Sequence, residues 1–284
     1  MAAVGLDRSS SRVATTARYF VLVALALVFL VPFYLMVRNA LSTDAQITNP
    51  EGWTWFPSNP QWSNITEVFS DSSVPLAHSL LNSAIIAVTQ TVVVLVISAM
   101  AGYGLARARV PYANAVFYLV LATLLIPAAV TFVPTFVMVS TLGWVSTLRG
   151  LIVPGLFQAL ATFLFRQHFL GYPRELEEAA MIDGAGPWRT FWRIVMPTSG
   201  GMLAAVGTIT FIGSWNAFLW PLVIGQDQSS WTVQLSLSTY VTAQSVNLHG
   251  MFMAALISML PLLLMFLLLQ RWIVAGVEQT GINE

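Results

Sequence analysis

Residues 178–197 read EAAMIDGAGPWRTFWRIVMP, and this stretch decides how the rest of the chain is interpreted. Charged side chains gather in and around it, although only 8% of all residues are charged. Pro173 suits the first position of a helix, and the acidic residues that follow favour its positive end. Gly184 is suited to end that helix, and Pro187 to start another. The pattern predicts two short helices, exposed to water or to another protein.

The second of these helices is expected to carry an apolar face. Side chains spaced at i, i+3, i+4 and i+7 lie on one side of a helix. The residues with this spacing are Trp188, Phe191, Trp192 and Val195.

The composition of the 284-residue chain is that of a membrane protein. Hydrophobic residues make up 57% of it and the mean hydropathy is +0.75, whereas soluble domains carry about 25% charged residues. The net charge is zero, which gives no indication of nucleic-acid binding. Cysteine is absent and all 12 basic residues are arginine. Without lysine the chain lacks the phosphate-binding loop of ATPases, so another subunit must hydrolyse any ATP that drives it.

Six apolar segments are predicted to span the membrane as helices. They are 19–37, 79–105, 115–137, 151–165, 200–224 and 251–269. Together they form a transmembrane domain over 19–276, with an N-terminal segment over 1–18 and a tail over 277–284. The first segment is predicted to be retained, since it lacks the cleavage site of a signal peptide. Pro127 and Pro134 are expected to kink the third.

The distribution of arginine gives the expected orientation. With six spans both termini lie on one side, and cytoplasmic loops are enriched in arginine. Only Arg38 and Arg149 fall on the opposite side. The arginines on the side of the termini are Arg8, Arg12, Arg18, Arg107, Arg109, Arg166, Arg174, Arg189, Arg193 and Arg271. The termini and the loop that contains 178–197 are therefore expected to be cytoplasmic.

The spacing within 178–197 resembles the EAA loop of ABC-importer permeases. That loop has the pattern E-A-A, three residues, glycine, nine residues and I-x-L-P; here Met196 stands in place of the leucine. The resemblance extends from about residue 19 to the C-terminus. It includes Asn82-Ser83, the run AGYGLAR at 101–107, Trp215-Asn216 and Gln270-Arg271. These pieces are similar to the smaller permease of carbohydrate ABC importers of the maltose-transporter type.

The resemblance implies an all-α type I ABC-importer permease in the cytoplasmic (inner) membrane of a prokaryote. Its partners would be a second, unlike permease, two ATPase subunits that bind ATP and Mg, and an extracytoplasmic solute-binding protein, with no cofactor in this chain. The cytoplasmic loop over 171–198, here named the EAA segment, would dock on the ATPase. Glu178 would pair with a basic residue there, and Gly184 would form the turn. The expected coupling residues are Glu177, Glu178, Ala179, Ala180, Asp183, Gly184, Arg189 and Pro197.

Neutral polar residues within the apolar segments are candidates for a solute path. Amides and hydroxyls beside aromatic rings suit an uncharged polyhydroxyl solute, although such groups also hydrogen-bond packed helices together. The candidates are Asn82, Gln90, Ser214, Trp215, Asn216 and Phe218. By the same resemblance, the loop over 226–250 is expected to contact the binding protein through Trp231, Gln234 and Tyr240.

The sequence leaves several other functions open. The same machinery moves a polyol, a glycerol-phosphate ester or an amino acid in the close alternatives. An ATP-independent carrier or channel is a different class, which would have no ATPase to dock. A membrane-embedded enzyme is disfavoured because no catalytic cluster is evident. No metal site is predicted, because His78, His168 and His249 lack the spacing of metal ligands.

Overall fold

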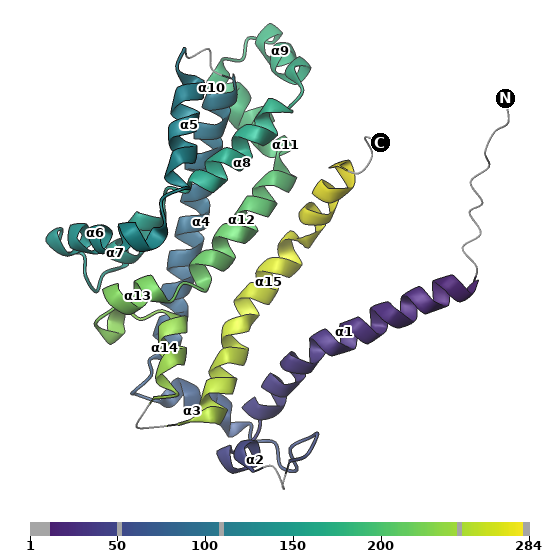
Figure 1. Ribbon diagram of the computed structural model, residues 1–284, viewed down its shortest axis with the longest axis vertical. Helices are drawn as coiled ribbons and strands as arrows, with labels where there is room; N and C mark the ends of the chain where they lie inside the picture. Colours follow the sequence, from purple (N-terminus) through teal and green to yellow (C-terminus); the bar gives the residue numbers. More distant parts are fainter. Residues whose placement is uncertain (1–11, 50–52, 108–110, 243–245, 281–284) are drawn as a thin grey trace. The chain divides into compact units, whose positions relative to one another are not determined.

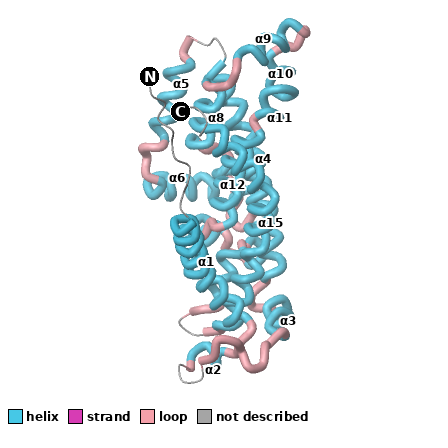
Figure 2. The backbone as a smooth tube through the Cα atoms, turned by 90° about the vertical axis from the view of Figure 1, so that its right-hand side faces the viewer, coloured by secondary structure: helices cyan, strands magenta, loops and turns pink. Residues whose placement is uncertain are grey.

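The computed structural model describes residues 12–49, 53–107, 111–242 and 246–280. Arg8, Arg109 and the last four residues of the predicted tail lie outside these ranges. Figure 2 shows helices joined by loops, and the described residues contain no β-structure beyond one bridge between Val241 and Val246. The α-helices are α1 Arg12–Ala40, α2 Asp44–Thr48, α3 Ser63–Ser70, α4 Leu76–Arg107, α5 Ala113–Thr123, α6 Ala128–Thr141, α7 Leu148–Ile152, α8 Ala159–Leu170, α9 Arg174–Ile182, α10 Pro187–Thr190, α11 Met196–Thr198, α12 Gly200–Trp215, α13 Leu219–Ile224, α14 Val233–Thr239 and α15 Leu248–Thr280.

Four of the described helical stretches are long and apolar enough to cross a membrane unbroken. They are Ala14–Ala40, Leu76–Arg107, Gly200–Ile224 and Leu248–Arg271. Two further pairs of helices reach that length only when each pair is taken as one bent span. These are α5 with α6, bent by 93°, and 148–155 with α8, bent by 41°. The all-helical membrane fold is confirmed.

The chain divides into two compact units, each described here by itself. The first comprises residues 1–70 and 240–257. In it, His249 joins three helices: its Nδ1 lies 2.9 Å from Asp44 Oδ1 on α2 and its Nε2 lies 3.1 Å from Glu67 Oε1 on α3. Asn64 on α3, within the predicted short amphipathic element, donates from Nδ2 to the carbonyls of Ala40 and Ser42. These polar contacts fold the loop after α1 back onto the end of that helix.

The second unit comprises residues 71–239 and 258–284, and α4 is its central element. Figure 1 shows α4 running the length of this unit beside α8 and α12, with α9 at one end and α13 and α14 at the other. At the α9 end, the core is a cluster of apolar and aromatic residues from α4, α8, α12 and the EAA segment. Its fully buried members include Val94, Ala99, Phe165, Phe169 and Val195.

Several boundaries differ from the predictions. The third segment is broken between Thr123 and Ala128, where Pro127 precedes α6, whereas Pro134 lies inside α6 without a break. The fourth continues past Arg166 to Leu170, and the fifth is interrupted between Trp215 and Leu219. A single hydropathy profile averages over such breaks, because the residues on both sides of them are apolar.

Candidate functional site

The EAA segment forms a helical hairpin with a turn at Gly184. Gly184 has a φ of +78°, in the left-handed region that favours glycine. Its N–H donates to Met181 O at 3.0 Å and the N–H of Ala185 donates to Ala180 O at 2.9 Å. This pair of bonds is a Schellman motif, which satisfies the last carbonyls of α9. The predicted helix end at Gly184 is confirmed, but Pro173 is the residue before α9 rather than its first helical residue.

The second half of the hairpin starts at Pro187, as predicted, and changes its winding midway. Residues Phe191–Val195 form one turn of π-helix, so that the N–H of Met196 bonds to Phe191 O, five residues back. Phe191 and Val195 are buried in the core cluster, whereas Trp188 is 64% exposed. The predicted apolar face is therefore covered only from Phe191 onward.

The outer surface of the hairpin is apolar with one acidic group. Glu178 and Ala179 are exposed on α9, beside Met181 and Leu176. Ile182 is 87% exposed, an unusual position for a large aliphatic side chain. This surface is of the kind that a partner protein covers.

Two of the predicted coupling residues face inward instead. Ala180 is buried. Glu177 is buried as well, and its Oε1 lies 3.0 Å from Nε of Arg107, at the end of α4. Glu177 therefore holds the segment to its own chain and does not contribute to the outer surface.

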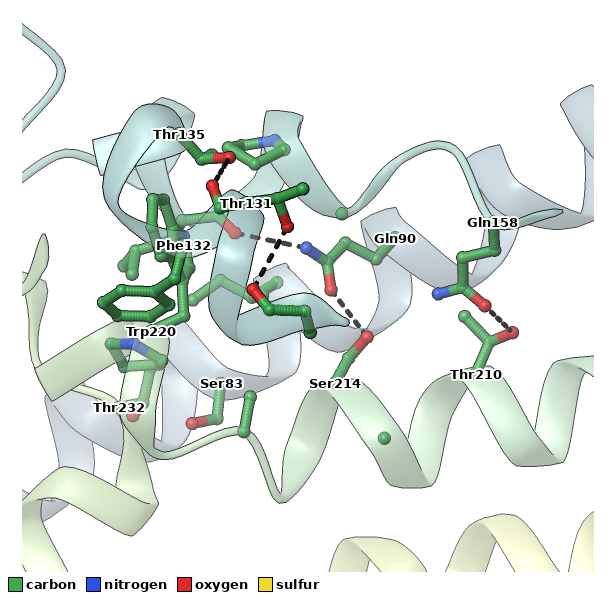
Figure 3. A pocket seen from close by; sticks show the side chains of 18 of the residues that line it. Ser83, Gln90, Thr131, Phe132, Thr135, Gln158, Thr210, Ser214, Trp220 and Thr232 are labelled. Carbon is green, nitrogen blue, oxygen red and sulfur yellow. Dashed lines mark hydrogen bonds between the residues drawn. The ribbon is translucent and has the colours of Figure 1, made fainter. Parts of the chain in front are cut away.

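A polar cavity of about 500 Å³ lies in the same unit, at the other end of the α4–α8–α12 core. Figure 3 shows its hydroxyl and amide side chains converging from α4, α6, α8 and α12. Its polar and aromatic lining residues are Ser83, Gln90, Thr131, Phe132, Thr135, Gln158, Thr210, Ser214, Trp220 and Thr232. None of its lining residues carries a charge.

Gln90 is the junction of this cavity. Its Nε2 donates to the carbonyls of Leu151 at 3.1 Å and Ile152 at 3.0 Å, and its Oε1 accepts from Ser214 Oγ at 2.6 Å. The lack of a side chain at Gly155 makes room for the amide, since a Cβ there would lie 2.5 Å from Gln90 Nε2. One amide thus joins α4, the α7 turn and α12 at the cavity wall.

The aromatic side of the cavity is formed by Phe132 and Trp220. Their rings meet edge to face with centroids 5.6 Å apart. Trp220 Nε1 donates to Gly150 O at 3.0 Å, which fixes the indole plane. Two rings beside several hydroxyls give the cavity one apolar and one hydrogen-bonding side.

Of the six candidate path residues, the structure brings only Gln90 and Ser214 into the cavity. Asn82 is buried and donates to the carbonyls of Ser229 and Trp231. Trp215 is buried too, stacked on Phe211 with its Nε1 bonded to Ser258 O. The two remaining candidates, Asn216 and Phe218, lie in the break between α12 and α13 and do not line the cavity.

The sequence analysis missed the contribution of α6. Thr131 and Thr135, four positions apart, share the face of α6 that lines the cavity, together with Phe132. Hydroxyls repeated at helical spacing within an apolar segment were the available signal. Gln158 and Thr210, whose side chains are 3.5 Å apart, were likewise missed.

Most of the loop over 226–239 packs on α4 of the same unit. Ser79 Oγ lies 2.6 Å from Ser236 Oγ, and Ser83 Oγ accepts from the N–H of Val233 at 2.8 Å. Trp231 and Gln234 remain partly exposed, with Gln234 bonded to Asn216. Tyr240, in the other unit, is buried and does not offer a contact surface to a binding protein.

Comparison with known proteins identifies the family. Residues 94–279 match the family described as binding-protein-dependent transport system inner membrane component. The sn-glycerol-3-phosphate transport system permease protein UgpE of Yersinia pestis bv. Antiqua (strain Antiqua) is 36% identical over 264 residues, covering 91% of this chain and 94% of that protein. The diacetylchitobiose uptake system permease protein NgcG of Streptomyces coelicolor is 29% identical over 276 residues, covering 95% and 90%.

A solved structure shares the fold. A chain in the crystal structure of a bacterial ABC transporter involved in the import of the acidic polysaccharide alginate matches with a TM-score of 0.77 at 20% identity. The match covers 92% of this chain and 98% of that one. The chain therefore belongs to the family of binding-protein-dependent transport system inner membrane components, as a permease subunit that crosses the membrane several times.

Proposed function

We propose that this permease forms half of the path for a neutral sugar or oligosaccharide. The observation that carries the proposal is the uncharged cavity with hydroxyls and amides on one side and two aromatic rings on the other. Sugars present hydroxyls around their edge and apolar C–H groups on their faces. Such a solute exchanges hydrogen bonds with water for hydrogen bonds with Thr131, Thr135 and Gln158, while a ring face packs on Trp220.

A phosphate ester is the second candidate, favoured by the name of the UgpE relatives. A phosphate is bound through cationic donors, which form its strongest hydrogen bonds. The cavity contains no arginine or histidine, and a charged solute in a cavity without counter-charge loses more hydration than it regains. The neutral solute is therefore preferred, with a polyol nearer to it in chemistry than an amino acid.

The EAA segment supports the coupling part of the proposal. Permeases of this family work with an ATPase and a solute-binding protein. We infer two ATPase subunits, which hold ATP and Mg, and a second, unlike permease. The exposed apolar surface of α9 and α10 docks on the ATPase, and Glu178 pairs there with a basic residue. An ATP-independent carrier would leave Ile182 and Trp188 uncovered in water.

The orientation follows from the same assignment. Within the second unit, Arg107, Arg166, Arg174, Arg189 and Arg193 belong to the EAA segment or to the ends of the helices beside it. Arginine marks the cytoplasmic side. The EAA segment and both termini are therefore proposed to be cytoplasmic, and the 226–250 loop extracytoplasmic.

Replacing the two α6 hydroxyls tests the cavity. Each lost hydrogen bond is worth about 0.5–1.5 kcal/mol, so Thr131→Val with Thr135→Val is expected to lower uptake at low solute concentration about tenfold. The measurement is uptake of labelled maltose, diacetylchitobiose and sn-glycerol-3-phosphate by the native cells carrying the wild-type or the variant chain. Thr141→Val is the matched control, because Thr141 lies on α6 outside the cavity and bonds to Val137 O as Thr135 bonds to Thr131 O.

The expected pattern is uptake of a neutral sugar that falls in the double variant and not in the control. Uptake of sn-glycerol-3-phosphate alone, unaffected by an excess of either neutral sugar, would overturn the assignment of the solute. Equal loss in the control would remove the cavity from the solute path.

A further inference from the structure

The buried ion pair between Arg107 and Glu177 connects two parts of the chain that are not consecutive. Arg107 is the last residue of α4, and Glu177 lies on the inner face of α9. The two side chains are each only 9% exposed and their charged atoms are 3.0 Å apart. Buried opposite charges attract far more strongly than exposed ones, and removing one of them leaves the other without compensation.

The same guanidinium also holds the entry of the EAA segment. Its Nη2 donates to the carbonyl of Tyr172. The hydroxyl of Tyr172 lies 2.7 Å from Thr198 Oγ1 at the exit of the segment, and His168 Nε2 lies 3.0 Å from Ser199 Oγ. The entry, the first turns of α9 and the exit are thereby fixed to one another and to the end of α4.

Helix α4 leads from this point to the polar cavity. It runs for 32 residues without proline or interruption. Gln90, which joins three elements at the cavity wall, lies 17 positions before Arg107, or about 26 Å along the helix axis. Ser83 and Ile86, further along α4, line the cavity too.

The chain itself attaches only α8 and α12 to the EAA segment. Helix α8 enters it through Gly171 and α12 leaves it after Ser199, whereas α4 ends at Arg107, far away in sequence. Side-chain contacts alone can therefore make α4 follow the segment. Packing with α8 contributes at Gly102, where the helices are so close that a Cβ would lie 2.7 Å from Phe165 Cβ. The ion pair is the one charged contact described between α4 and α9.

We propose that Arg107 and Glu177 are positioning residues that transmit the movement of the EAA segment to α4 and through it to the Gln90 junction of the cavity. This inference rests on the proposed coupling of the segment to an ATPase. When the segment moves with its partner, α4 moves with it, and the bonds from Gln90 to the α7 turn and to Ser214 rearrange. Without the pair, α8 and α12 still move and α4 does not.

The test uses the complete importer, reconstituted in proteoliposomes with its partner subunits. Single substitutions leave a buried charge unpaired and reduce folding, so the informative variant is Arg107→Gln with Glu177→Gln, which removes both charges. It is expected to assemble with the ATPase and hydrolyse ATP, while the amount of solute moved per ATP falls about tenfold. Exchanging the charges, with Arg107→Glu and Glu177→Arg, is expected to restore part of that ratio. Glu175→Gln, an exposed acid on the same helix, is the control.

A second measurement separates positioning from simple stabilisation. Because the chain contains no cysteine, Thr135→Cys gives a single thiol in the cavity whose reaction with a polar maleimide reports access. ATP is expected to change the labelling rate with the ion pair intact and to leave it unchanged in the doubly neutral variant. A doubly neutral variant with a wild-type ratio of transport to hydrolysis and a wild-type response to ATP would overturn the inference. Recovery of the wild-type chain without any ATPase would instead overturn the proposed function.

Discussion

Gly184→Trp is expected to abolish solute uptake while leaving the amount of inserted chain unchanged. The φ of +78° at Gly184 costs an L-residue about 1–2 kcal/mol. A Cβ at this position would meet nothing within 4 Å, so the new side chain causes no clash within the chain. The damage falls on the turn between α9 and α10 and on the outer surface that a partner covers. The measurement is uptake per amount of chain in the membrane fraction.

Alanine variants separate the backbone effect from bulk. Gly184→Ala is expected to lower uptake, because alanine is strained at positive φ. Gly186→Ala is the matched control two residues later, where φ is −73° and a Cβ also has open space. Equal loss of uptake in both alanine variants, or loss of inserted chain in Gly184→Trp, would contradict the assignment of Gly184 to coupling.

Gly102→Val is expected to have the largest effect on stability. A Cβ at Gly102 would lie 2.7 Å from Phe165 Cβ and 2.8 Å from the backbone nitrogen of Arg166, so α4 and α8 must separate. Overpacking of this kind costs about 1–3 kcal/mol, and here it strikes the most extensive helix contact of the unit. The measurement is the fraction of detergent-solubilised chain that stays monodisperse after heating.

The control for this prediction is Gly104→Val, two positions along the same helix. A Cβ at Gly104 has no atom within 4 Å. Both variants carry the same loss of glycine and the same β-branched residue in a helix, so only the contact with α8 differs. Equal heat sensitivity of the two variants would show that the close approach at Gly102 does not stabilise the protein.

The hairpin of the EAA segment could be predicted from sequence because its determinants are local. Gly184 and Pro187 act on their own backbone, and glycine at a left-handed position or proline at a helix start needs no tertiary contact. The number and rough extent of the apolar segments follow likewise from composition. What local rules did not give was the break before α6, because the flanking residues are as apolar as those of a continuous span.

The direction in which α9 side chains face could not be predicted from sequence. Glu177 and Glu178 are neighbours of identical chemistry, yet one is buried against Arg107 and the other is exposed. The difference depends on where α4 ends in space, and Arg107 is 70 positions earlier in the chain. Pairing of distant charges becomes visible only once the helices are packed.

The solute path shows the same limit. Trp215 and Asn82 have the chemistry of sugar-binding residues, but the structure uses both to join helices and loops. Thr131 and Thr135 have ordinary chemistry, and they face the cavity because α6 turns by 93° away from α5. A residue type indicates what a side chain can bind, whereas the fold decides whether it meets the solute.

The most direct test of the account is recovery of partner subunits with the tagged chain from detergent-solubilised native membranes. The account predicts that an ATPase subunit co-purifies with the wild-type chain and that its recovery falls with Glu178→Lys, which reverses the exposed charge of the EAA surface. Glu175→Gln should recover it as the wild type does. A wild-type chain that purifies alone, or only with copies of itself, would contradict the account and favour an ATP-independent carrier.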